Sequence, residues 1–128
     1  MILADTSAIY ALLDRSDNNH THAVRIIREI QHRGQEILMT NFTLAECHAL
    51  LLRKLGTAIS REWLQNNVWP VIRVTEADED MAKMIILGYR DKAFSYTDAT
   101  TFAVMKRLQI KEAYTFDRHF KQFGLRVL

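Results

Sequence analysis

The sequence predicts an α/β protein with a parallel sheet, and three observations predict it. Short apolar segments alternate along the chain with longer segments of helical periodicity. One proline and four glycines leave too few turn residues for an all-β fold. The 128 residues are 48% hydrophobic and 25% charged, which is ordinary for a globular protein and excludes a disordered or fibrous chain. We expect one domain over residues 1–128.

Five short segments are apolar enough to be buried strands. The first is bounded by Asp5, and each of the others is followed or preceded by residues that start or stop a helix. The expected strands are Ile2–Ala4, Ile37–Thr40, Val71–Val74, Ala113–Phe116 and Leu125–Leu128. Because helices separate most of them, the strands are expected to run parallel, with any site beyond their carboxyl ends.

The intervening segments predict helices with recognisable ends. In the second helix the apolar residues recur at i, i+3, i+4 and i+7, and Gly34 follows its end. Thr75 and Asp78 are spaced like a capping box, and Ser60 and Thr97 are expected to be N-caps. The expected helices are Thr6–Leu13, Asn19–Arg33, Phe42–Leu55, Ser60–Asn67, the segment from Thr75 to Gly88, and Thr97–Leu108, with one helical turn after the fourth strand.

Three carboxylates stand alone in otherwise uncharged stretches. Asp5 is the only formal charge from residue 1 to 13, Glu46 from 37 to 52, and Asp98 from 93 to 105. A fourth acid, Asp117, directly follows the strand that ends at Phe116. A charge in a buried segment costs several kcal/mol unless something compensates it. Each acid falls near the carboxyl end of a strand, so we expect the four to converge on one cleft.

A structural role is available to three of these acids. Asp5 can cap the helix that begins at Thr6, Asp98 gains from a helix macrodipole, and Asp117 can pair with Arg118 or His119. Glu46 lies past its helix start and has no such explanation. Four converging carboxylates repel one another, and a bound Mg²⁺ or Mn²⁺ removes that repulsion. Acid-bound divalent cations are the usual apparatus for hydrolysing phosphodiesters.

Four motifs resemble the PIN domain family, the nuclease fold named for the PilT N-terminus, over essentially the whole chain. They are Leu3-Ala4-Asp5-Thr6-Ser7-Ala8, Leu44-Ala45-Glu46, Phe94-Ser95-Tyr96-Thr97-Asp98-Ala99 and Thr115-Phe116-Asp117-Arg118-His119-Phe120. Their order and spacing are most similar to VapC-type toxins, the ribonuclease halves of toxin–antitoxin pairs. The resemblance implies a three-layer α/β/α fold with a twisted, mainly parallel five-stranded sheet.

The resemblance also implies a function and its residues. It implies Mg²⁺- or Mn²⁺-dependent endonuclease cleavage of RNA, a homodimer, and inhibition by a small antitoxin protein. Asp5, Glu46, Asp98 and Asp117 take the place of the catalytic, metal-binding acids. Thr6 and Ser7 follow the first acid as in the family, where a hydroxyl can orient a carboxylate or satisfy helix-start amides. Thr97 is expected to be an N-cap that can also contact the site.

Basic residues near the motifs are candidates for RNA binding. If the four site acids are set aside from the 15 acidic groups, 11 remain against 17 basic groups, a balance of +6. Arg118, Lys121 and Lys92 are the substrate-binding candidates, and a solvated surface explains them equally well. The acidic run from Glu76 to Asp80 is interpreted as a solvated helix start. No signal peptide or membrane-span pattern is visible, which predicts a cytoplasmic protein without a membrane partner.

Two other functions fit parts of the pattern. A non-catalytic PIN module that binds RNA or a protein partner would have the same fold, but it has no need of four intact acids. An aspartyl phosphatase would use Asp5 as its nucleophile, but such enzymes usually carry a second Asp two residues on, where Ser7 stands.

Overall fold

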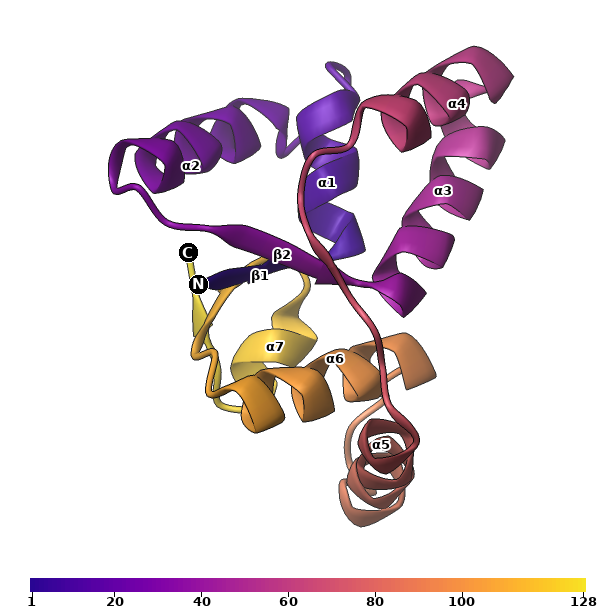
Figure 1. Ribbon diagram of the computed structural model, residues 1–128, viewed down its shortest axis with the longest axis vertical. Coiled ribbons are helices and arrows are strands. Elements are labelled where there is room, and N and C mark those ends of the chain that lie inside the picture. The colour runs from indigo at the N-terminus through magenta and orange to yellow at the C-terminus, as the bar shows by residue number, and fades with distance from the viewer.

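The computed structural model describes residues 1–128, and at its centre is a five-stranded sheet in which every strand pair is parallel (Figure 1). The strands are β1 (Ile2–Ala4), β2 (Ile37–Thr40), β3 (Val71–Ile72), β4 (Glu112–Tyr114) and β5 (Arg126–Val127). Their order across the sheet is β3-β2-β1-β4-β5. β1 is central, so Asp5 leaves the middle of the sheet.

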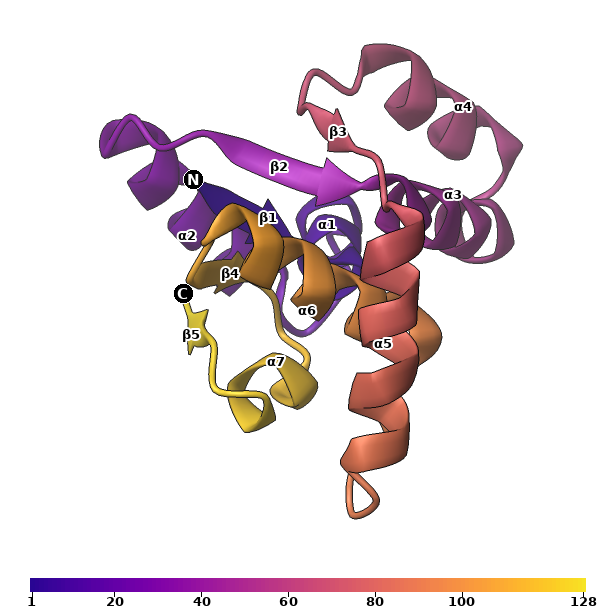
Figure 2. The same ribbon diagram turned by 60° about the horizontal axis from the view of Figure 1, so that its bottom comes forward.

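Seven helices cover the sheet. They are α1 (Thr6–Leu13), α2 (His20–His32), α3 (Asn41–Leu55), α4 (Thr57–Asn66), α5 (Glu76–Gly88), α6 (Tyr96–Leu108) and α7 (Arg118–Gln122). Figure 2 shows α5, α6 and α7 together on one side of the sheet, while α1, α2 and α3 pack on the other. The predicted α/β/α fold with a five-stranded parallel sheet is therefore confirmed.

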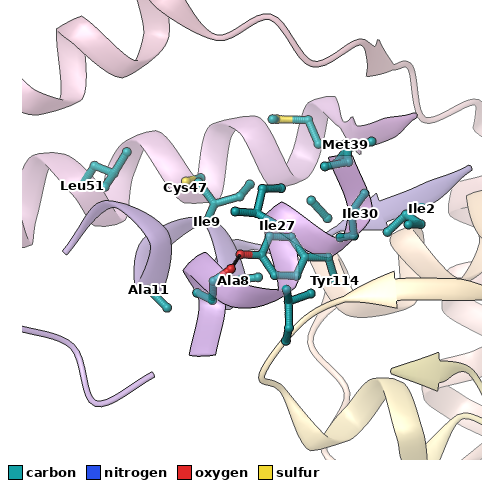
Figure 3. Close-up of a cluster of buried hydrophobic side chains, with 14 residues drawn as sticks. Ile2, Ala8, Ile9, Ala11, Ile27, Ile30, Met39, Cys47, Leu51 and Tyr114 are labelled. Carbon is teal, nitrogen blue, oxygen red and sulfur yellow. Dashed lines mark hydrogen bonds between the residues drawn. The ribbon is translucent and has the colours of Figure 1, made fainter. Parts of the chain in front are cut away.

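The alternation of side chains along the strands divides the core into two clusters. On β1, Ile2 and Ala4 pack against α1, α2 and α3, whereas Leu3 faces α5, α6 and α7. Figure 3 shows the first cluster, in which the Tyr114 ring from β4 lies among side chains of α1 and α2. The Tyr114 hydroxyl donates to the carbonyl of Ala23 at 2.7 Å, which satisfies its polar atom and ties β4 to α2. Burial raises the pKa of this phenol.

Three predicted strands, β3, β4 and β5, are shorter than expected, and in β3 and β4 the last predicted amides bond elsewhere. Beyond β3 the backbone N–H of Val74 donates to the Asn41 side chain, not to β2. Beyond β4 the backbone N–H of Phe116 donates to the Ser7 hydroxyl at 2.9 Å. The residues after Tyr114 therefore leave the sheet and turn toward the start of α1.

Two sequence interpretations of polar residues outside the site were wrong. Ser60 does not cap a helix: α4 begins earlier, at Thr57, and the Ser60 hydroxyl donates to the Thr57 carbonyl within the helix. Gly56, at φ +93°, ends α3 and starts α4, a conformation that L side chains rarely adopt. Asp78 is not solvated: it completes the capping box with Thr75, is 3% exposed, and accepts a two-pronged hydrogen bond from Arg107.

None of the seven helices is long and apolar enough to cross a membrane.

Candidate active site

Asp5 begins the site as the residue that links β1 to α1. It is the N-cap of α1 and only 4% exposed. Its Oδ2 atom accepts hydrogen bonds from the Ser7 hydroxyl at 2.7 Å, the Thr115 hydroxyl at 3.0 Å and the Ser7 backbone N–H at 3.3 Å. The carboxylate is therefore held in one orientation by neutral donors on one of its two oxygens.

The surroundings of Asp5 disfavour its charged form. Burial raises the pKa of Asp5 to about 6, although the hydroxyls of Ser7 and Thr115 pull it down. The negative charge of Asp98 raises the pKa of Asp5 further. No lysine or arginine pairs with Asp5. At neutral pH this arrangement leaves negative charge without a compensating cation.

Thr115 connects the first acid to the fourth. Its hydroxyl donates to Asp5 and accepts from the backbone N–H of Asp117 at 2.9 Å. The Ser7 hydroxyl does the same for the neighbouring peptide, since it donates to Asp5 and accepts from Phe116. The two hydroxyl oxygens lie 3.2 Å apart. Ser7 was predicted to orient a carboxylate or satisfy an amide, and it does both.

Asp98 lies at the start of α6, whose N-cap is not the predicted residue. Ser95, not Thr97, is the N-cap: its hydroxyl accepts from the Asp98 backbone N–H at 3.0 Å, and Asp98 Oδ2 accepts from the Ser95 N–H at 3.3 Å. The helix therefore begins at Tyr96. Asp98 is 7% exposed, and the capping box fixes its carboxylate at the carboxyl end of the sheet.

Asp117 and His119 complete a cluster with Asp98. Asp117 is the N-cap of α7, and its Oδ1 accepts from the backbone N–H of His119 at 2.9 Å. His119 Nδ1 lies 2.9 Å from Asp98 Oδ2 and 3.4 Å from Asp117 Oδ1. One ligand atom from each of these three residues can be chosen so that all lie within 4.8 Å of one another, a spacing that could hold a metal ion.

Sequence reasoning did not select His119 or Thr115 as site residues. His119 was weighed only as a structural partner of Asp117, although it lies two residues beyond that acid at the start of a helix. Thr115 lies two residues before Asp117 and was assigned to the strand. Their positions on either side of the fourth acid were the available signal.

Glu46 is the one acid of the four that the structure does not draw into this network. It is exposed on α3 and makes no hydrogen bond or ion pair. Its metal-binding role stays a prediction. Thr6 has a buried hydroxyl without a hydrogen-bond partner, and the Thr97 hydroxyl makes no hydrogen bond.

The three basic candidates differ in their surroundings. Arg118 and Lys121 are exposed on α7, the helix that Asp117 caps, and neither makes an ion pair. Lys92 pairs with Asp91 at 2.9 Å on the surface. Arg118 and Lys121 therefore have their charges available beside the site, whereas Lys92 shares its charge with a neighbouring acid.

The donor set suits a divalent cation. One carboxylate oxygen on each of Asp5, Asp98 and Asp117 accepts no hydrogen bond, and none of these oxygens is sealed from solvent. Oxygen donors of this kind are what Mg²⁺ and Mn²⁺ prefer. The uncompensated charge around Asp5 gives the same indication, because a cation would relieve the repulsion that raises its pKa.

Comparison with known proteins identifies the family of this chain. The family model described as "PIN domain" matches residues 2–125. The chain belongs to the PIN domain family. Its acids at the carboxyl edge of the sheet are thus placed on a nuclease-type scaffold, as the resemblance implied.

Individual PIN proteins are similar over nearly the whole chain. The 23S rRNA-specific endonuclease VapC20 of Mycobacterium tuberculosis is 29% identical over 127 residues, which cover 97% of this chain and 95% of that protein. The crystal structure of M. tuberculosis VapC20, described as a Sarcin-Ricin loop cleaving toxin, has a TM-score of 0.86 at 28% identity and covers 98% of this chain and 96% of that one. FitAcB from Neisseria gonorrhoeae, at 18% identity, has a TM-score of 0.75 over 100% of this chain and 96% of that chain, which shows the shared fold.

Proposed function

We propose that this PIN protein is a Mg²⁺- or Mn²⁺-dependent endoribonuclease and the toxin of a toxin–antitoxin pair. The observation that carries the proposal is the set of buried carboxylates at the carboxyl edge of the sheet, unpaired with lysine or arginine. Membership of the PIN family and the similarity to VapC20, named as an rRNA endonuclease, support it. A purely structural role would not require three acids to be linked in one network through Thr115 and His119.

Asp5, Asp98 and Asp117 would hold the metal through their carboxylate oxygens, with Glu46 as the fourth predicted ligand. A bound Mg²⁺ or Mn²⁺ lowers the pKa of a coordinated water and offsets charge on the phosphate. The chain's own contribution is orientation: Ser7 and Thr115 hold Asp5, and Ser95 holds Asp98. Because these donors are packed before substrate arrives, the acids need no reorganisation during the reaction.

The RNA backbone would lie along the start of α7. Arg118 and Lys121 are exposed there, free of ion pairs, and next to Asp117 in the fold. Such side chains bind phosphates without reading the base sequence. The first RNA to test is the sarcin–ricin loop, because that is the loop named for the structure of VapC20.

The partners follow from the same family similarity. We expect a small antitoxin protein to inhibit the nuclease, a homodimer in solution, and a cytoplasmic location where ribosomal RNA is available. Mass measurement of the protein alone tests whether it is a homodimer. The same measurement with the protein encoded by the neighbouring gene tests whether an antitoxin binds it.

The test is cleavage of end-labelled RNA in Mg²⁺, Mn²⁺ or EDTA by the wild type and by Asp98→Asn. A sarcin–ricin loop RNA and a pool of other structured RNAs serve as substrates. Loss of an acid that holds the metal is expected to lower the rate about 100- to 1,000-fold, as removal of one preorganised catalytic group does. Asp91→Asn, at an exposed acid outside the network of Asp5, Asp98 and Asp117, is the control and should cleave like the wild type.

Metal-dependent cleavage that Asp98→Asn abolishes and Asp91→Asn retains would support the proposal. Full activity of Asp98→Asn would refute it. RNA binding without turnover in either metal would favour the non-catalytic module.

A further inference from the structure

We infer that His119 is a nitrogen ligand of the metal centre and that it shifts the preference of the site from Mg²⁺ toward Mn²⁺. The inference rests on the proposed function, because it concerns the same metal. It adds a residue outside the four predicted acids and a selectivity that an all-oxygen site would not have.

The distances fit coordination of one ion. Two adjacent ligands of an octahedral ion, each about 2.1 Å from it, are about 3.0 Å apart. His119 Nδ1 lies 2.9 Å from Asp98 Oδ2 and 3.4 Å from Asp117 Oδ1, both close to that value. The cluster is therefore spaced as ligands of a shared ion are, before any ion is added.

The fold holds the imidazole in place. His119 lies in the first turn of α7, and its backbone N–H is fixed by the Asp117 carboxylate. Its ring packs edge-on against Phe94 with 5.5 Å between ring centroids, and its side chain is 20% exposed. The only charged groups that it contacts are the two carboxylates. The imidazole of His119 therefore lies close enough to the oxygens of Asp98 and Asp117 to bind the same ion.

The chemistry of the donor then determines the metal. Mg²⁺ is bound in proteins almost entirely through oxygen, whereas imidazole nitrogen suits transition metals such as Mn²⁺. A site of carboxylates plus one histidine should thus favour Mn²⁺ more than carboxylates alone would. If His119 only donates a hydrogen bond to Asp98, it would orient that acid but would never bond to the ion.

Electron paramagnetic resonance of Mn²⁺ bound to the full-length protein distinguishes ligation from orientation. Titration of Mn²⁺ gives its Kd, competition by Mg²⁺ gives the second affinity, and electron spin echo modulation detects nitrogen bonded to the ion. The proteins compared are the wild type, His119→Gln, Asp98→Asn and His22→Gln. His22 is the matched control, because its ring contacts Phe116 beside the site but lies on α2.

We expect nitrogen modulation in the wild type and in His22→Gln, and none in His119→Gln. The Mn²⁺ affinity of His119→Gln should fall at least about 10-fold, the lower end for lost metal-site partners, while its Mg²⁺ affinity changes by less than about 3-fold. Wild-type protein labelled with ¹⁵N-histidine should replace the ¹⁴N modulation by ¹⁵N coupling. That measurement needs no variant and stands if His119→Gln fails to fold.

Mn²⁺ bound to the wild type without nitrogen coupling would overturn the inference and leave the proposed function intact. Coupling that persists in a folded His119→Gln, or an unchanged ratio of the two affinities, would overturn it as well. If the wild type binds neither metal, the inference fails together with the proposed metal-dependent function. Tight Mn²⁺ binding that Asp98→Asn abolishes would show that the ion measured is the one at this site.

Discussion

Replacement of Asp5 by Asn should stabilise the metal-free protein at neutral pH. Burial and the negative charge of Asp98 raise the pKa of Asp5 from 3.8 to about 6. Because the carboxyl binds its proton more tightly in the folded state, its ionised form destabilises the fold above pH 6. All three hydrogen bonds go to Oδ2, so an asparagine oxygen can accept them. The charge is removed and the contacts are kept.

The size of the effect follows from the shift. Two pKa units correspond to about 3 kcal/mol, since each unit is worth about 1.4 kcal/mol. The penalty in the wild type is full above pH 7 and fades as the pH falls from 6 toward 4. Linkage gives a gain for Asp5→Asn of about 3 kcal/mol at pH 7.5 and about 1 kcal/mol at pH 4.5. For a chain of this length, the gain at pH 7.5 corresponds to a rise in Tm of roughly 10 °C.

Urea denaturation in EDTA at the two pH values measures both numbers. Asp78→Asn is the control of opposite sign, because Arg107 holds the pKa of that buried carboxyl below its usual range. Its loss should cost about 2 kcal/mol at pH 7.5, as for a broken hydrogen bond between charged groups. Added Mn²⁺ should stabilise the wild type and not Asp5→Asn, so the difference in their free energies of unfolding becomes smaller. A less stable Asp5→Asn at pH 7.5, or an equal gain at both pH values, would refute the reasoning.

Two further predictions concern catalysis and substrate. Thr115→Ala should lower kcat about 10-fold or more with little change in KM. Thr115→Ser should recover most of the lost kcat, because it restores the hydroxyl that joins Asp5 to Asp117. Steady-state cleavage kinetics of the two variants test this prediction. The double variant Arg118→Gln, Lys121→Gln should raise KM and leave kcat nearly unchanged. It should also reduce the slope of log KM against log salt concentration by about 1–2, because two phosphate contacts are lost. Arg53→Gln, at an exposed arginine on α3, is the control and should keep the wild-type slope.

The sequence predicted the elements that are bounded by strong local signals. Ile2–Ala4 and Thr6–Leu13 were placed correctly because a charge and a hydroxyl separate a wholly apolar strand from its helix. The capping box at Thr75 was identified for the same reason, since the cap and its partner are the only candidates at that spacing. Where two cap residues compete, the sequence misled: Thr97 and Ser95 both precede helix-forming residues, and only the fold shows whose hydroxyl reaches the amide of Asp98.

Of the site, the sequence predicted the acidic residues but not the hydrogen bonds that connect them. An isolated acid in an apolar stretch can be read directly from the residues, and three of the four acids were found in one network with Thr115, Ser7 and His119. The network was not predictable, because the bonds that join Asp5 and Ser7 to Thr115 and Phe116 link residues more than 100 positions apart, and they exist only once β1 and β4 lie side by side. Pairing of those strands is a long-range event that no local pattern encodes.

The chemistry of that network explains why the site keeps its charge. Ser7 and Thr115 orient Asp5 with neutral hydroxyls, whereas Asp78, in the same fold, is held by the guanidinium of Arg107. An arginine beside Asp5 would have lowered the pKa of that acid and stabilised the fold, but it would also have neutralised the site. Neutral donors fix the geometry and leave the negative charge for a cation. The ionised Asp5 carboxylate is thus predicted to destabilise the metal-free protein for the same reason that it favours cation binding: its charge has no partner.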